Sequence, residues 1–100
     1  MIFHITDVEE LNKTKTRGYL SNPSLEIEGF IHLCTDSQIS GVLNRYFQGK
    51  KDLILMTINP DKLDVPLRYE WSDAQQESFP HVYGTIKISA IESFSEIDPV

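Results

Sequence analysis

Three histidines and one cysteine are the side chains of this sequence best suited to acid–base, nucleophilic or metal chemistry near neutral pH. His32 and Cys34 lie two positions apart in the apolar stretch 29–35, so a strand would place them on one face. His4 lies in a second apolar stretch, and His81 stands in an aromatic one. Titratable side chains in buried strands cost free energy unless they are hydrogen-bonded or used. The three histidines therefore predict a functional site.

Metal binding and cysteine catalysis are the first two chemistries to consider. Zinc uses ligands of the types that His4, His32, Cys34 and His81 offer, but their spacing matches no compact zinc pattern, and we predict no metal site. Cys34 could act as a nucleophile with a histidine base, but neighbours on one strand rarely have the required geometry. We expect Cys34 to be a small core residue.

A binding or transfer site made of histidines, hydroxyl groups and one carboxylate is the third candidate. Glu70 is the carboxylate of interest, because it alternates with apolar residues along the stretch 65–71 and precedes a polar loop. The other acidic residues lie mainly in predicted helix caps, turns and the tail. Two alternatives stay open: Glu70 can form an ordinary exposed pair with Arg68, and the histidines can be hydrogen-bonded structural residues.

Composition limits the class of protein. One hundred residues predict a single domain spanning 1–100, and 40% hydrophobic with 24% charged residues is typical of a globular chain. A net charge of −6 argues against a nucleic-acid partner. No apolar run approaches the roughly 20 residues that cross a bilayer, and we expect no membrane partner. A single cysteine cannot form an internal disulfide, which fits a cytoplasmic location.

The elements that must position these residues follow from hydrophobic patterning. Strands are predicted at 2–6, 29–34, 53–58 and 65–71, with more strand after a polar loop at 72–78 and in the tail 91–100. Capping boxes at Thr6 and Thr35 predict two helices. The second helix has apolar residues at spacing i, i+3, i+4, i+7 and i+8, from Ile39 to Phe47, and is expected to end near Gly49. The predicted class is α+β with five or six strands.

Five blocks of the sequence together carry a family resemblance. They are His4, Gly29–His32 with Thr35, Asn44–Phe47, Leu67–Glu70 and Phe79–Gly84. They resemble domain-of-unknown-function family 952, a family of small, mostly bacterial single-domain proteins. The resemblance runs from about residue 2 to residue 91. Cys34 departs from the family pattern, in which serine is usual, and this argues against a required cysteine chemistry.

The resemblance implies a fold similar to the ADP-ribosyltransferase superfamily. Such a fold has a split, strongly bent β-sheet with two flanking helices, and it binds NAD in a cleft. Matched by position, His4 would contact the ribose, His32 would lie beside the nicotinamide, and Glu70 would stabilise the ribosyl cation. The implied catalytic residues are thus Glu70 and His32. The implied cofactor contacts are His4, His32, Thr35, His81 and Tyr83, with Tyr83 and Phe30 stacking on a ring.

Two functions remain open at this point. In the first, the domain binds NAD or another small nucleotide ligand with an ADP-ribose group, and transfers or hydrolyses that group. In the second, the domain is a non-catalytic binding module on the same fold, with structural histidines. The sequence contains no unmistakable catalytic pattern around a carboxylate, so it does not decide whether the protein is an enzyme. Whether the three histidines face one cleft would discriminate between the two.

Overall fold

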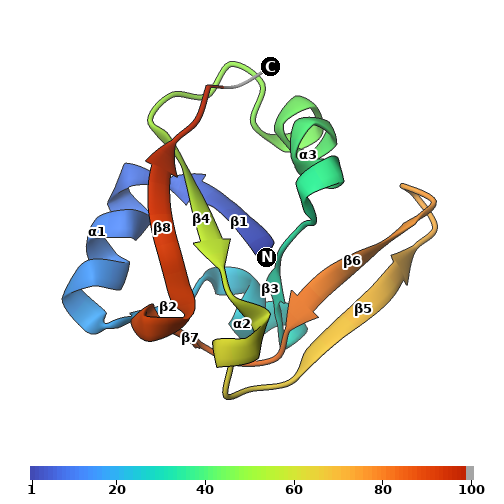
Figure 1. Cartoon of the computed structure of the whole chain (residues 1–100). Coiled ribbons are helices and arrows are strands. Elements are labelled where there is room, and N and C mark those ends of the chain that lie inside the picture. The colour runs from blue at the N-terminus through green and yellow to red at the C-terminus, as the bar shows by residue number, and fades with distance from the viewer. Residues whose placement is uncertain (99–100) are drawn as a thin grey trace.

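The computed structural model describes residues 1–98, and a three-stranded antiparallel sheet forms one side of it (Figure 1). Its strands are β1 (Ile2–Asp7), β4 (Leu53–Ile58) and β8 (Ile91–Glu96), in the order β1–β4–β8. His4 lies opposite Met56 on the central strand β4, and Met56 lies opposite Phe94 on β8. The apolar stretch 53–58 is buried at four of its six positions, as expected for a central strand.

A second three-stranded sheet has the order β3–β6–β5. Its strands are β3 (Ile31–His32), β6 (Glu77–Val82) and β5 (Leu67–Ser72), and β5 and β6 form a hairpin that projects from the body of the molecule (Figure 1). His32 lies directly opposite His81 in this sheet. The strands β2 (Tyr19–Leu20) and β7 (Ile86–Lys87) pair separately.

The two larger sheets are joined at one point and diverge from there. Phe3 on β1 and Cys34 exchange two backbone hydrogen bonds of 2.8 Å, which form an isolated antiparallel bridge. Nearby, Nδ1 of His4 is 2.9 Å from the carbonyl oxygen of His32. The segment after β3 thus connects the sheets, and His4 and His32 stand at the connection.

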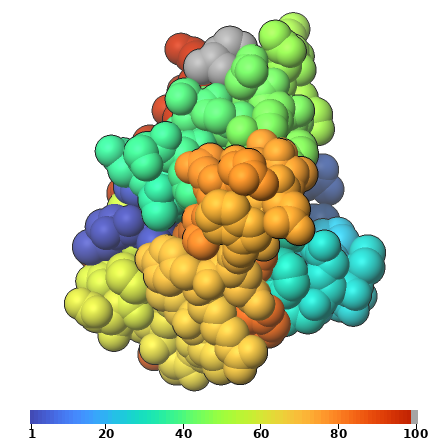
Figure 2. Space-filling model, turned by 90° about the vertical axis from the view of Figure 1, so that its right-hand side faces the viewer, coloured from blue at the N-terminus to red at the C-terminus, as the bar shows by residue number. Residues whose placement is uncertain are grey.

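Three α-helices cover the sheets. They are α1 (Val8–Arg17), α2 (Pro23–Glu28) and α3 (Ile39–Tyr46), and three short 3₁₀ turns lie at Asp36–Gln38, Pro60–Lys62 and Ile88–Ala90. In the space-filling view the β5–β6 hairpin, gold to orange, has α3 above it and α2 to its right (Figure 2). In the part of the chain that the structure describes, no helix is long and apolar enough to cross a membrane.

The hydrophobic core consists of two clusters. The larger lies between the sheets and includes Ile31, Met56 and Val82, all fully buried. The smaller joins β1 to α3 and includes Cys34 and Leu43. Cys34 is 2% exposed, so its packing role is the one expected from the sequence.

The α+β class is confirmed, but the expected number of elements is wrong. The described residues contain eight strands in three antiparallel sheets and three α-helices, not one sheet of five or six strands with two helices. The unexpected helix is α2. Its signals were present: Asn22 caps it, Pro23 occupies its first turn, and Gly29 ends it with a left-handed φ of 90°. Such a short helix lacks the hydrophobic periodicity that identifies longer ones.

Several boundaries also differ from expectation. The strand predicted at 29–34 is regular only over Ile31–His32, because the chain then leaves the second sheet to bridge to β1. The predicted loop 72–78 is shorter, since the hairpin strands extend into both of its ends. The predicted tail strand exists as β8 and ends at Glu96; residues 99–100 lie outside the described residues.

Candidate functional site

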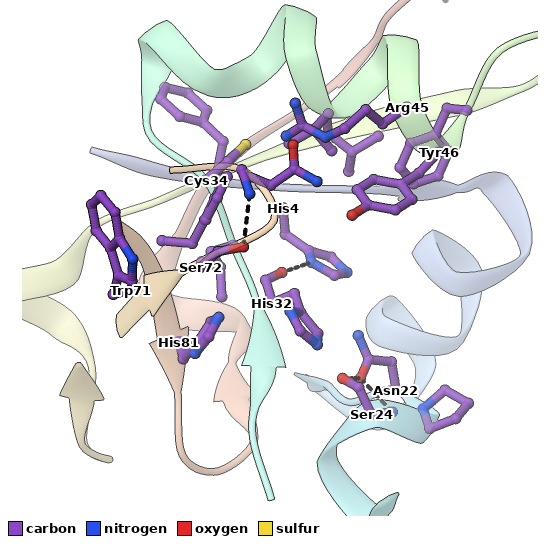
Figure 3. A pocket seen from close by; sticks show the side chains of 18 residues that line it. His4, Asn22, Ser24, His32, Cys34, Arg45, Tyr46, Trp71, Ser72 and His81 are labelled. Atoms are coloured by element: carbon purple, nitrogen blue, oxygen red, sulfur yellow. Dashed lines mark hydrogen bonds between the residues drawn. The ribbon is translucent and has the colours of Figure 1, made fainter. Parts of the chain in front are cut away.

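A cavity of about 670 Å³ lies where the two sheets diverge, beneath α3 (Figure 3). All three histidines line it, each from a different strand. The other polar or aromatic residues along it are Phe3, Asn22, Ser24, Cys34, Arg45, Tyr46, Phe47, Trp71, Ser72, Gln75 and Phe79. The topology therefore brings side chains that are far apart in the sequence, from Phe3 to His81, around one cavity.

His4 is the buried histidine of the cavity, with 7% of its surface exposed. Its Nδ1 lies 2.9 Å from the carbonyl oxygen of His32. Since a carbonyl oxygen only accepts, Nδ1 carries the proton. Burial lowers the pKa of His4, and the hydrogen bond to His32 offsets this only in part. The ring is thus neutral at pH 7, and its Nε2 is a hydrogen-bond acceptor.

His32 lies at the outer side of the cavity and is half-exposed. Its Nε2 is 2.6 Å from a carboxylate oxygen of Glu28, at the end of α2. Its ring is edge-on to that of His81, with 5.1 Å between ring centroids. The side chain is therefore oriented from both sides, by a carboxylate and by a second imidazole.

His81 takes part in a hydrogen-bonded group on the hairpin side. Its Nδ1 donates to Glu70 Oε1 over 2.9 Å, and the Tyr83 hydroxyl donates to the same oxygen. These two bonds lower the pKa of Glu70, the one from Tyr83 contributing most, and the bond to Glu70 raises the pKa of Tyr83. Glu70 therefore stays ionised, holds the His81 ring, and leaves Nε2 of His81 without a hydrogen bond to residues 1–98.

Phe30 fixes the opposite side of the His81 ring. The two rings are stacked, with 4.0 Å between centroids and 15° between planes. Tyr83 is tilted against Phe30 at 5.2 Å. Phe30 and Tyr83 thus support His81 and do not line the cavity, so the stacking role expected for them is not one this cavity offers.

Cys34 lines the cavity but is poorly suited to act as a nucleophile. Burial raises the pKa of its thiol to about 11. A thiol with such a pKa is almost entirely protonated at pH 7, whereas nucleophilic cysteines have lowered pKa values. This agrees with its packing against Leu43 of α3.

Gln38 links the start of α3, above the cavity, to the β5–β6 hairpin by a hydrogen bond. The Gln38 amide donates to the Ser78 carbonyl over 2.9 Å, and its carbonyl oxygen accepts from the Thr35 backbone N–H. Thr35 and Gln38 together form the expected capping box, which places Thr35 at the helix start, outside the cavity lining. Tyr46 and Trp71 remain 59% and 60% exposed at the cavity and lie on opposite sides of it (Figure 3).

The residues expected at the site divide into two groups. His4, His32 and His81 come together at the cavity. Glu70 and Tyr83 lie behind His81, and Thr35 serves the helix start. The catalytic role of Glu70 and His32 stays a prediction.

Three more residues line the cavity without having been predicted at the site: Arg45, Tyr46 and Trp71. Tyr46 was expected on the buried face of its helix but lies exposed at the cavity edge. Within residues 1–98 no group of three or more His, Cys, Asp or Glu is arranged to hold a metal ion.

Comparison with protein families identifies the chain. Residues 5–94 match the family model described as "Protein of unknown function (DUF952)". The chain belongs to this family. A comparison with curated proteins gives no match.

Solved structures show that this DUF952 domain shares its fold with protein CC0527 from Caulobacter crescentus. The crystal structure of CC0527 is 26% identical and has a TM-score of 0.87, with 97% of this chain and 85% of that chain covered. Its solution NMR structure gives a TM-score of 0.82 at 26% identity, with 97% and 84% covered. The described residues of this chain therefore form a fold that experiment has established in a relative.

Proposed function

We propose that the cavity binds a small nucleotide of the ADP-ribose type, with NAD as its complete form. The observation that carries this proposal is the convergence of His4, His32 and His81 on one cavity from three strands. A volume of about 670 Å³ lies within the roughly 300–1,000 Å³ of small-molecule sites. The three side chains offer hydrogen bonds to a ligand, and packing of the hydrophobic core does not require three imidazole groups at this cavity.

His4 suits a ribose in particular. Its neutral ring presents Nε2 as an acceptor, because Nδ1 is bound to the His32 carbonyl. Ribose hydroxyl groups are the natural donors to such an acceptor. A bound ligand would cover this nitrogen, and an acceptor that is covered without receiving a donor costs free energy, so Nε2 would disfavour ligands without a hydroxyl group.

The exposed aromatic residues suit the rings of such a nucleotide. Tyr46 and Trp71 line the cavity on opposite sides and are more than half exposed (Figure 3). Large exposed aromatic side chains at a cavity offer stacking faces to planar ligand groups. Two antiparallel sheets that diverge around the cavity are also the arrangement that an ADP-ribosyltransferase-like split sheet would have, which supports the proposal at the level of the fold.

Isothermal titration calorimetry with ADP-ribose and NAD tests the proposal. We expect saturable heat with the wild-type chain and much weaker binding with His4→Asn. The Asn side chain keeps an N–H for the His32 carbonyl but has no atom where Nε2 stood. Adenine and nicotinamide, which lack ribose, serve as ligand controls that His4→Asn should leave unchanged. No heat at millimolar ADP-ribose or NAD with a folded chain would refute the proposal.

The Glu70–His81 pair supports a second candidate, hydrolysis of NAD. A carboxylate that holds one imidazole nitrogen leaves the other free to exchange protons with a ligand. Water would attack the anomeric carbon of the nicotinamide ribose while the C–N bond breaks. Nicotinamide would leave as a neutral molecule with the bonding electrons, and Nε2 of His81 would accept the proton that water loses. In this role Glu70 is a positioning residue.

Chromatographic detection of nicotinamide distinguishes binding from hydrolysis. Turnover by the wild-type chain, lost in His81→Gln and shifted in its pH profile by Glu70→Gln, would support hydrolysis. Bound NAD that stays intact would leave the binding module as the function. Loss of turnover in Glu70→Gln with an unchanged pH profile of residual activity would instead favour direct stabilisation of the ribosyl cation by Glu70.

A further inference from the structure

The charges along the cavity differ from those of the rest of the chain. The chain has 15 acidic residues and a net charge of −6, yet no Asp or Glu lines the cavity. Arg45 is the one lining residue with a permanent positive charge. The carboxylates of Glu28 and Glu70 lie behind His32 and His81 and pair with them. Among the described residues of this acidic chain, the only fixed charge along the cavity is thus positive.

Among residues 1–98, Arg45 has no carboxylate partner. None of the ion pairs among residues 1–98 involves it, whereas Arg17 pairs with Glu10 at 2.6 Å. Its neighbours are the rings of Tyr46 and Phe79, whose centroids lie 5.7 and 6.0 Å from the guanidinium carbon. Aromatic faces hold a guanidinium in place without occupying its N–H donors. Its five donors are therefore not occupied by any residue of the described chain and can bind a ligand.

Gly41 leaves room for this guanidinium against α3. Gly41 lies one turn earlier on α3, and a Cβ built there would be 3.1 Å from Nη1 of Arg45. Glycine inside a helix costs about 0.5–1 kcal/mol relative to alanine, and Gly41 does not have the positive φ that would require glycine. The close approach of Arg45 is what a side chain at this position would disturb.

We propose that Arg45, held by Tyr46 and Phe79 in the space that Gly41 leaves, binds the phosphate of the ligand, so that the cavity selects phosphorylated small molecules. Guanidinium groups bind phosphate through paired, charge-assisted hydrogen bonds. The choice of phosphate over carboxylate rests on the proposed nucleotide. In Figure 3, Arg45 and Tyr46 lie on the α3 side of the cavity, with His4 and His32 below them. The phosphate would thus bind under α3 and the ribose toward the histidines.

Titration of the full chain with four probes tests the inference. Trp71 is the only tryptophan and lines the cavity, so its fluorescence and calorimetry both report binding. We expect Arg45→Gln to weaken ADP-ribose and inorganic pyrophosphate about tenfold or more, and Arg45→Lys to weaken them less. Adenosine, which lacks phosphate, should bind both variants as it binds the wild-type chain. Malonate shows whether a carboxylate serves instead.

The matched control is Lys87→Gln, which removes one positive charge outside the cavity lining. Lys87 is exposed on β7 and lies 3.7 Å from exposed Asp64. The Lys87→Gln variant should bind all four probes with wild-type affinity. Arg45 is itself exposed, so Arg45→Gln should keep the fold, which circular dichroism verifies.

The outcomes separate the two proposals. Unchanged pyrophosphate and ADP-ribose affinity in Arg45→Gln would overturn the inference, and so would failure of both probes to bind the wild-type chain. An equal loss in Lys87→Gln would show a general charge effect and overturn it too. Binding of malonate alone would assign the site to carboxylates, against the proposal. Arg45-dependent binding of pyrophosphate without ADP-ribose would refute the proposed function and leave the phosphate site standing.

Discussion

The neutral state of buried His4 predicts how stability changes with pH. Burial lowers the pKa of His4 in the folded chain below its ordinary value of 6.5. As the pH falls below 6.5, the unfolded chain binds a proton at this residue that the folded chain does not bind. Unfolding is then favoured, so the free energy of unfolding decreases as the pH falls toward the folded pKa, and it is regained above 6.5.

The magnitude follows from one proton. The free energy of unfolding changes with pH by at most about 1.4 kcal/mol per pH unit for one proton. This limit is reached where His4 is protonated in the unfolded chain and neutral in the folded chain. For a domain of this size, 1 kcal/mol corresponds to roughly 4–8 °C in melting temperature. Urea unfolding measures this free energy between pH 7.5 and 5.5, a window in which histidines titrate but ordinary carboxylates do not.

His4→Asn is the variant that isolates this contribution. It keeps an N–H for the His32 carbonyl and does not titrate, so the slope between pH 7.5 and 5.5 should become shallower. NMR of the wild-type chain gives an independent reading, in which the His4 ring becomes protonated only at a pH below 6.5. An equal slope in both chains, together with a His4 ring that titrates at or above pH 6.5, would refute the reasoning.

Three further predictions concern other residues. Gly41→Ala should raise the free energy of unfolding by about 0.5–1 kcal/mol in urea titrations, and it should shift the Arg45 guanidinium because of the 3.1 Å approach; a lower stability would contradict this. The thiol of Cys34, with its pKa of about 11, should react with a disulfide reagent at pH 8 only after urea unfolds the chain, and rapid reaction in the folded chain would speak against burial. Tyr83→Phe should raise the pKa of Glu70, measured by carboxyl ¹³C NMR, because the strongest hydrogen bond lowering it is lost; stability contributed by ionised Glu70 would then be lost at a higher pH on acidification.

Local sequence patterns were sufficient for the regular elements with strong periodicity. The apolar run at Leu53–Ile58 and the stripe along α3 predicted their elements because burial alone determines them. The extent of the short elements could not be predicted in this way. The strand predicted at 29–34 is regular only over β3, because its length depends on pairing with β6, which is a long-range contact that no local pattern contains.

The sequence predicted the three histidines of the candidate site but not its one arginine or its exposed aromatic residues. His4, His32 and His81 attracted notice because a polar ring in an apolar strand is costly. Arg45 and Trp71 have residue types that are ordinary on a surface, so only the fold shows that they line a cavity. The position of Glu70 behind His81 likewise depends on the register of the β5–β6 hairpin, where Glu70 lies opposite Phe79.

An NMR titration of the full chain with ADP-ribose tests the central claim most directly. The account predicts saturable shifts of the imidazole signals of His4, His32 and His81 and of the Trp71 indole, with contacts between the ribose protons and the His4 ring. Pyrophosphate alone should perturb Arg45 and leave the His4 ring unchanged. The result that would contradict the account is binding with shifts confined to residues outside the cavity, or no shift at millimolar ADP-ribose.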